Sequence, residues 1–189
     1  MSRIELHTPE TAPPSSRPIF ERVIEASPEL PFILNIWAAM AESALTLEAY
    51  MALREAIEHR ATLDPRVRSA VSLAVGDAIG GRYSPAINER IAARAGWSPA
   101  EIGAFRRGES QDARLRPLLA LVREAATAVG HVTDSTWLAA RTAGWAASEL
   151  AEAFTIVMLV TFIDGFANFA EVEPDAALQP AGPLPSVAV

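Results

Sequence analysis

The chain has 189 residues, enough for one domain with a sizeable core, and half of them are hydrophobic. Its formal net charge of −7 comes from 23 acidic and 16 basic residues, so neither nucleic acid nor anionic lipid is an expected partner. The chain has no cysteine, which excludes disulfides and thiolate metal sites. Its first residues lack the apolar stretch of a secretory signal, so we expect a cytoplasmic location.

Alanine and leucine dominate the composition and β-branched runs are few, which predicts an all-α domain without strands. Prolines punctuate residues 1–18 and 174–189, so these segments are expected to be a flexible N-terminal arm and a flexible C-terminal tail. The helical domain then covers residues 19–173. Within it, or at its edges, helices are expected over 17–26, 31–42, 46–60, 65–79, 85–95, 99–107, 113–129, 134–142 and 147–172.

Several helix starts have a local signature in which a short polar residue precedes proline. The pairs are Asp64-Pro65, Ser84-Pro85 and Ser98-Pro99. A side-chain oxygen at the cap satisfies a free backbone N–H, and proline at the next position loses nothing because its N–H would be unpaired there. Pro117 does not fit this pattern: it falls inside the expected 113–129 helix, which therefore begins later or bends.

A turn signature occurs twice. Ala95-Gly96-Trp97 is followed by Glu101-Ile102, and Ala143-Gly144-Trp145 is followed by Glu149-Leu150. In both copies a glycine past the end of a helix suits the left-handed conformation and the tryptophan can fold back onto the last turn. We therefore expect two related helix-turn-helix units in one bundle.

The last helix carries an apolar stretch from Phe154 to Ile163, between Glu152 and Asp164. This stretch is too short to span a membrane, so it is interpreted as a buried helix that a second subunit helps to cover. Asp164 and Asn168 lie one turn apart on this helix. Buried polar groups must be hydrogen-bonded, so the two are expected to form a structural polar pair between helices or subunits.

From Asp64 to Ile102 the order is helix, glycine break, helix, Ala-Gly-Trp turn, helix. This order resembles the alkylhydroperoxidase D-like or carboxymuconolactone decarboxylase family, over roughly residues 30 to 175. Peroxidases of that family carry a glutamate, a Cys-x-x-Cys pair and a histidine. The matching positions hold Ser69, Gly81, Ser84 and Asn88. The resemblance thus implies the family's helical fold and an oligomer, a trimer or a hexamer, without its thiol chemistry.

What remains at these positions supports two interpretations. Ser84 before Pro85 is either a helix cap or a serine nucleophile, and a nucleophile would need a nearby base. The histidines, His7, His59 and His131, lie far from it in sequence.

Asp77 and Tyr83 are candidate pocket residues. Asp77 is either a general base or a solvated carboxylate paired with an arginine such as Arg82. Ser69 is expected to pack or cap locally. No metal-ligand spacing or phosphate loop occurs, so neither a metal nor a cofactor is expected.

The main functional hypothesis is a non-redox oligomeric binding or assembly subunit, and one version pairs it with a cysteine-bearing relative. The alternative is an enzyme with different chemistry on a small organic acid, of decarboxylase or hydrolase type. Peroxidase activity is the least favoured interpretation, because a recycling thiol is required and none is present.

Overall fold

The computed structural model describes residues 2–27 and 32–178, and within them all regular structure is helical. The helices are α1 (Arg17–Glu25), α2 (Asn35–Met40), α3 (Ala44–Arg60), α4 (Pro65–Ala78), α5 (Ser84–Arg94), α6 (Pro99–Arg106), α7 (Leu115–Thr127), α8 (Asp134–Thr142) and α9 (Ala147–Ala170), followed by a 3₁₀ turn, η1 (Ala176–Leu178). This agrees with the all-α class expected from the composition.

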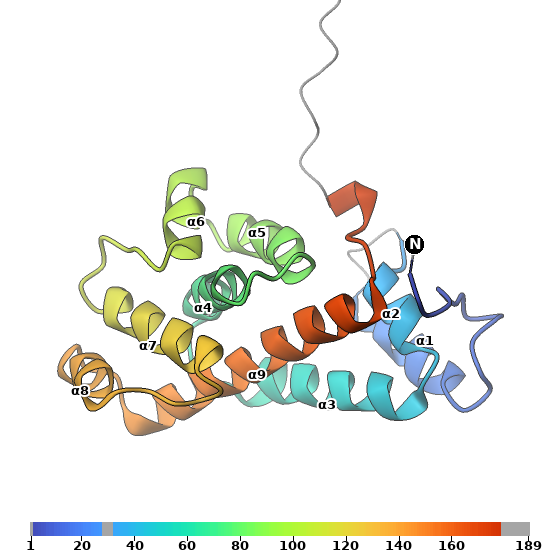
Figure 1. Cartoon of the computed structure of the whole chain (residues 1–189), viewed down its shortest axis with the longest axis horizontal. Helices are drawn as coiled ribbons and strands as arrows, with labels where there is room; N and C mark the ends of the chain where they lie inside the picture. Colours follow the sequence, from blue (N-terminus) through green and yellow to red (C-terminus); the bar gives the residue numbers. More distant parts are fainter. Residues whose placement is uncertain (1, 28–31, 179–189) are drawn as a thin grey trace, which may run out of the picture.

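Helix α4 is the centre of the bundle and contacts α5, α6, α7 and α9. Helix α9 runs between α7 and α8 at one end of the molecule and α1 and α2 at the other, with α3 along its side (Figure 1). Two hydrophobic clusters follow from this arrangement. The first joins α4, α6, α7 and the first half of α9. The second joins α1, α2 and α3 with Tyr83 and the last turns of α9.

Helix α9 has 24 residues with a mean hydropathy of 1.8 over its most apolar window, and 39% of that window is buried. By length and composition alone it could cross a membrane, but the core helix of a soluble protein has the same properties. Here its buried side packs against α3, α4 and α7. Much of its apolar surface is therefore not covered by the described part of the chain.

Most expected helix limits agree with the structure within two or three residues, and two helices begin later than expected. Helix α2 begins at Asn35 rather than 31, and residues 28–31 lie outside the described residues. Helix α7 begins at Leu115, so Pro117 lies in its first turn, where a missing N–H removes no helical hydrogen bond.

Residues 2–16 are packed onto the domain, in place of the free arm expected from their composition. The N–H of Arg3 donates to the carbonyl of Ala170 at 2.8 Å, and the N–H of His7 donates to that of Ala38 at 3.1 Å. The side chains of His7 and Ala12 are buried. These contacts tie the segment to α9 and α2, in addition to the hydrogen-bonded turns that it forms within itself.

The C-terminal segment is also packed as far as Leu178. It forms the turn η1 and buries Asp175 and Leu178. The expected tail from 179 to 189 lies outside the described residues.

Both Ala-Gly-Trp turns have the same local structure. Gly96 and Gly144 have positive φ angles of 88° and 93°. The N–H of Trp97 donates to Ala92, and the N–H of Trp145 donates to Ala140, which closes the preceding helix. The two indole N–H groups donate to the carbonyls of Arg66 and Arg114, and each arginine lies over its indole ring, at 3.9 and 4.0 Å from the centroid.

Candidate functional site

The connection from α4 to the first residue of α5 contains positions 81 and 84, which the family resemblance matches to the two cysteines of its motif. Gly80 has a φ of 64°, and the N–H of Gly81 donates to the carbonyl of Gly76 at 2.8 Å, which ends α4. Helix α5 then begins at Ser84, followed by Pro85. The first backbone N–H groups of α5 need a partner from outside the helix.

Asp164 of α9 supplies that partner. Its Oδ1 accepts from the N–H groups of Tyr83 and Ser84 at 3.0 and 2.9 Å, and its Oδ2 accepts from the hydroxyl of Ser84. The side chain of Asp164 is 1% exposed. A carboxylate at a helix N-terminus is also favoured by the helix dipole. Asp164 therefore caps α5, and the expectation that Ser84 itself is the cap is corrected: Ser84 is the first helical residue and donates to the capping carboxylate.

The same carboxylate fills the space beside Gly81. A Cβ atom placed on Gly81 would lie 2.1 Å from Oδ2 and 2.4 Å from Cγ of Asp164. No side chain can be accommodated at that distance without moving Asp164. Position 81 is therefore closed to a side chain, and only glycine fits there while Asp164 caps α5.

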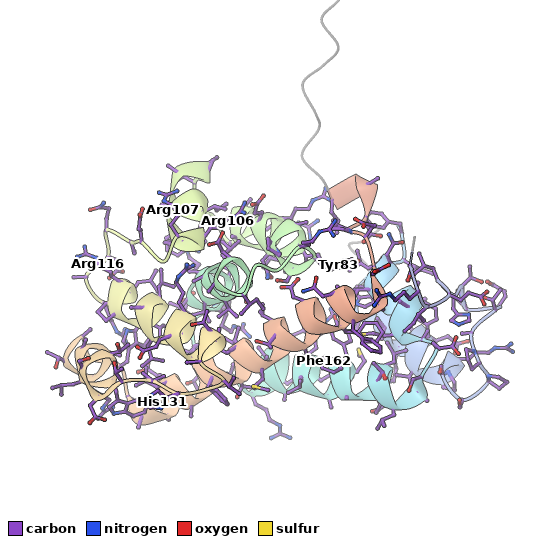
Figure 2. All side chains as sticks on the ribbon, viewed as in Figure 1. Tyr83, Arg106, Arg107, Arg116, His131 and Phe162 are labelled. Carbon is purple, nitrogen blue, oxygen red and sulfur yellow. The ribbon has the colours of Figure 1, made fainter. Side chains whose placement is uncertain are left out.

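Tyr83 is fully buried between α5 and the C-terminal segment (Figure 2). Its hydroxyl donates to Oδ2 of Asp175 and accepts from the N–H of Ile36 at 3.0 Å. The other oxygen of Asp175 accepts from the N–H of Asn35, also at 3.0 Å. Burial, and then the hydrogen bond to Asp175 and its charge, raise the pKa of Tyr83 far above its usual value. Tyr83 is thus a neutral donor that joins α5, α2 and the C-terminal segment.

Replacing Tyr83 by phenylalanine should lower the free energy of unfolding by about 2 kcal/mol. The substitution leaves the Ile36 N–H and one Asp175 oxygen buried without this partner. Urea unfolding monitored by circular dichroism measures the effect. Tyr50→Phe is a control in the same core, where the bond from the Trp37 indole is lost. A cost no greater than that of Tyr50→Phe would contradict the proposed importance of the Tyr83 hydroxyl.

The remaining degenerate positions have separate surroundings. The hydroxyl of Ser69 donates to the carbonyl of Arg66 at 2.7 Å and accepts from the indole of Trp97 at 3.2 Å, so it belongs to the start of α4 and the Ala-Gly-Trp turn. Asn88 is half-buried on α5. Of the four positions, Gly81 and Ser84 share Asp164 as a neighbour.

Asp77 is half-buried and paired with two arginines. Its carboxylate lies 3.5 Å from Nε of Arg106 and 3.3 Å from Nη1 of Arg123; Arg106 is seen on α6 in Figure 2. Arg82, the partner considered from sequence, instead pairs with Glu173 at 2.9 Å. Asp77 thus links α4 to α6 and α7.

The other polar candidates do not add a base to Ser84. Asn168 is exposed while Asp164 is buried, so the two do not share an environment in the described chain. His7 is bonded to Glu42 at 2.7 Å, and His59 and His131 are exposed. The described residues contain no group of three or more side chains arranged to hold a metal ion.

Sequence reasoning missed two partners that define this region. Asp164 was expected in a polar network between helices or subunits, and its bonds to Tyr83 and Ser84 form a network between helices, but nothing in its spacing indicates that α5 is the partner. Asp175 falls in the expected flexible tail, and its burial against Tyr83 has no local signal in the sequence.

Comparisons with known proteins bear on the fold. No protein-family model and no curated protein sequence matches the chain. Among solved structures, an uncharacterised peroxidase-related protein from Ralstonia eutropha JMP134, described as an alkylhydroperoxidase AhpD core, aligns with a TM-score of 0.81 and 17% identity over 94% of each chain. The chain has the alkylhydroperoxidase D-like fold.

Two further structures with this fold are similar to the chain. A peroxidase-related protein from Silicibacter sp. TM1040 aligns with a TM-score of 0.77 and 16% identity, over 94% of this chain and 93% of that one. The debrominase Bmp8, as a cysteine-to-alanine variant in complex with 2,3,4-tribromopyrrole, aligns with a TM-score of 0.76 and 17% identity, over 93% and 92%. This chain therefore combines the alkylhydroperoxidase D-like fold with a sequence that has no cysteine.

Proposed function

We propose that this protein is a non-redox, cytoplasmic member of the alkylhydroperoxidase D-like group that acts as a homo-oligomeric binding or assembly subunit. The observation that carries the proposal is the position of Asp164, whose carboxylate occupies the space beside Gly81 and caps α5. We infer that the position which the family resemblance matches to a thiol serves here to hold two helices together. The work of the protein is then done through its surfaces.

The surface best suited to a partner is the uncovered side of α9. Six of the exposed residues of α9 follow one another at spacings of three, four or seven, as in the contact stripe of paired helices. They are Ala147, Ala151, Phe154, Met158, Gly165 and Phe169. Phe154, Met158 and Phe169 are 41%, 45% and 71% exposed. No charged residue lies between Glu152 and Asp164, so α9 of a second copy is a suitable partner for this stripe.

The repeated helix-turn-helix organisation fits the same proposal. Trp97 with Arg66 and Trp145 with Arg114 make matching contacts in two parts of the chain. We infer that α4–α6 and α7–α9 are two copies of one unit. The second copy differs because its third helix is extended to form α9 and its apolar stripe.

Met158→Glu should dissociate the oligomer, because a charge placed in the apolar stripe loses its solvation when two α9 helices pack together. Size-exclusion chromatography with light scattering measures the mass. Ala120→Glu, at an exposed position of α7, is the matched control and should leave the mass unchanged. A wild-type protein that is monomeric at all concentrations would refute the proposal.

The version with a cysteine-bearing relative has its own test. The native protein, isolated under conditions that preserve complexes, should then carry that relative in a fixed ratio. Isolation as a homo-oligomer alone supports the homo-oligomeric form of the proposal and removes the mixed one.

The second candidate function is an enzyme with remodelled chemistry on a small organic acid. The similarity to the debrominase Bmp8 favours it, since this fold also carries enzymes that act on small molecules. The hydroxyl of Ser84, however, is buried and bonded to Asp164. A hollow of about 480 Å³ between α7, α8 and α9 is lined by His131, Trp137 and Phe154 and includes neither Ser84 nor Asn88. Turnover of a small acid that Ser84→Ala abolishes, with the oligomer intact, would establish this candidate instead.

A further inference from the structure

The segment from Val172 to Leu178 lies across α2 and α5 like a bound peptide. Val172 and Leu178 are buried at its two ends and belong to the second hydrophobic cluster. Between them, Asp175 is buried against the hydroxyl of Tyr83 and the N–H of Asn35. Buried apolar ends and one buried carboxylate are the anchors of a specific peptide site rather than of a loose tail.

Polar contacts at the edge of the segment add to these anchors. Glu173 pairs with Arg82 at 2.9 Å, and its carbonyl accepts from the side chain of Asn35 at 3.1 Å. The carbonyl of Ala177 accepts from Arg90 at 3.0 Å. All of these partners lie on α2, on α5 or in the turn before α5, so the segment is held by a surface to which it is joined only through α9.

The junction between α9 and this segment is a single residue in an unfavourable conformation. Glu171 has a φ of 51°, in the left-handed region that residues other than glycine seldom adopt. The chain turns back there, and the N–H of Val172 donates to the carbonyl of Ala167 at 2.8 Å. If Glu171 instead continued α9 as a helix, this strain would be relieved and the segment would project away from its own domain.

An apolar side chain lies uncovered beside this junction. Phe169, two residues before Glu171, is 71% exposed, although it is one of the large hydrophobic residues of α9. It lies at the end of the exposed stripe of α9. A second chain that crosses at this place would cover it.

We propose that residues 172–178 are exchanged between two copies of the chain, so that each segment occupies the surface of α2 and α5 on its partner. This inference rests on the proposed homo-oligomer and specifies how two copies are joined. Every contact that the segment makes with α2, α5 and the turn before α5 is regained in the partner, because the two surfaces are identical. The exchanged dimer is then favoured over the monomer by release of the backbone strain at Glu171 and by burial of Phe169. Strained short connections are known to favour such exchange.

The test uses the absence of cysteine in the 189-residue chain. Arg82→Cys and Glu173→Cys chains are mixed, unfolded in urea, refolded together and treated with a short bismaleimide. Exchange predicts a covalent dimer that contains one chain of each kind, on a denaturing gel with mass spectrometry. Arg114→Cys mixed with Glu149→Cys is the matched control, because this pair also joins an arginine and a glutamate at 3.1 Å but lies outside the exchanged segment.

A second pair of variants tests the junction. Glu171→Gly and Glu171→Ala both remove the ion pair with Arg3, but only glycine adopts the left-handed conformation without strain. The covalent dimer should therefore be about fivefold less abundant with Glu171→Gly than with Glu171→Ala, which corresponds to about 1 kcal/mol. Equal yields would contradict the role of strain at Glu171.

The outcomes separate this inference from the function on which it rests. If the mixed Arg82→Cys and Glu173→Cys chains give no covalent dimer with one chain of each kind while the protein elutes as an oligomer, exchange is wrong and the proposed function stands. If the protein is a monomer throughout, both are wrong.

Discussion

Gly81→Ala is expected to lower the free energy of unfolding by about 3 kcal/mol, a large effect for the addition of one methyl group. The new Cβ would lie 2.1 Å from Oδ2 of Asp164, so the carboxylate must move. Movement costs overpacking strain and weakens the bonds to Tyr83 and Ser84. Urea unfolding at a fixed protein concentration measures the loss.

Gly103→Ala is the matched control. A Cβ on Gly103 of α6 meets nothing nearer than the end of the Arg107 side chain at 3.7 Å. Alanine in a helix is favoured over glycine by up to about 1 kcal/mol, so this variant should be slightly more stable than the wild type. A Gly81→Ala protein as stable as the wild type would show that Asp164 does not close the site.

The same geometry predicts that a thiol cannot simply be restored. Gly81→Cys should be destabilised like Gly81→Ala, and the combination with Ser84→Cys and Asn88→His should still give no peroxide turnover with a dithiol reductant. The cost of Gly81→Ala should fall by about 1–2 kcal/mol in an Asp164→Ala background, because the obstructing group is then absent. Additive effects of the two substitutions would contradict a direct clash.

Asp164→Ala is expected to cost about 3–4 kcal/mol of stability, the second large effect. It removes the cap of α5 and leaves the N–H groups of Tyr83 and Ser84 and the Ser84 hydroxyl without their buried partner. Asp164→Asn should cost less, because one oxygen remains to accept the two N–H bonds. Denaturant unfolding gives the loss, and hydrogen exchange at the Tyr83 and Ser84 amides shows whether it is local to the cap.

Asn168→Ala is the control for this prediction, one helical turn away on the same helix. Asn168 is exposed, so its replacement should change stability by no more than about 0.5 kcal/mol. Similar costs for the two substitutions would instead favour the polar pair that the spacing of Asp164 and Asn168 suggested.

Local signals in the sequence were dependable wherever the physical cause is local. The caps Asp64 and Ser98 accept hydrogen bonds from Arg66 and Glu101, a few residues away. Gly96 and Gly144 have the positive φ angles that their turns require. Such interactions depend on spacing along the chain, which the sequence displays directly.

Local sequence patterns gave wrong predictions where a residue distant in the sequence supplies a hydrogen bond that a neighbouring residue was expected to supply. Ser84 has the pattern of a cap, yet Asp164, on the last helix, accepts the free N–H groups of α5. A carboxylate accepts two N–H bonds and a hydroxyl bond at once, which one serine oxygen cannot do. The prolines of the C-terminal segment suggested a flexible tail, but Asp175 is held by Tyr83.

The sequence by itself determined the helical class, the absence of any cysteine and most helix starts. Composition decides the first two, and short-range capping decides the third. Only the tertiary structure shows that Asp164 leaves room for no side chain at position 81, which arginines pair with Asp77, and which side of α9 is left uncovered. These depend on which helices pack together, and helix periodicity identifies an apolar face without naming its neighbour.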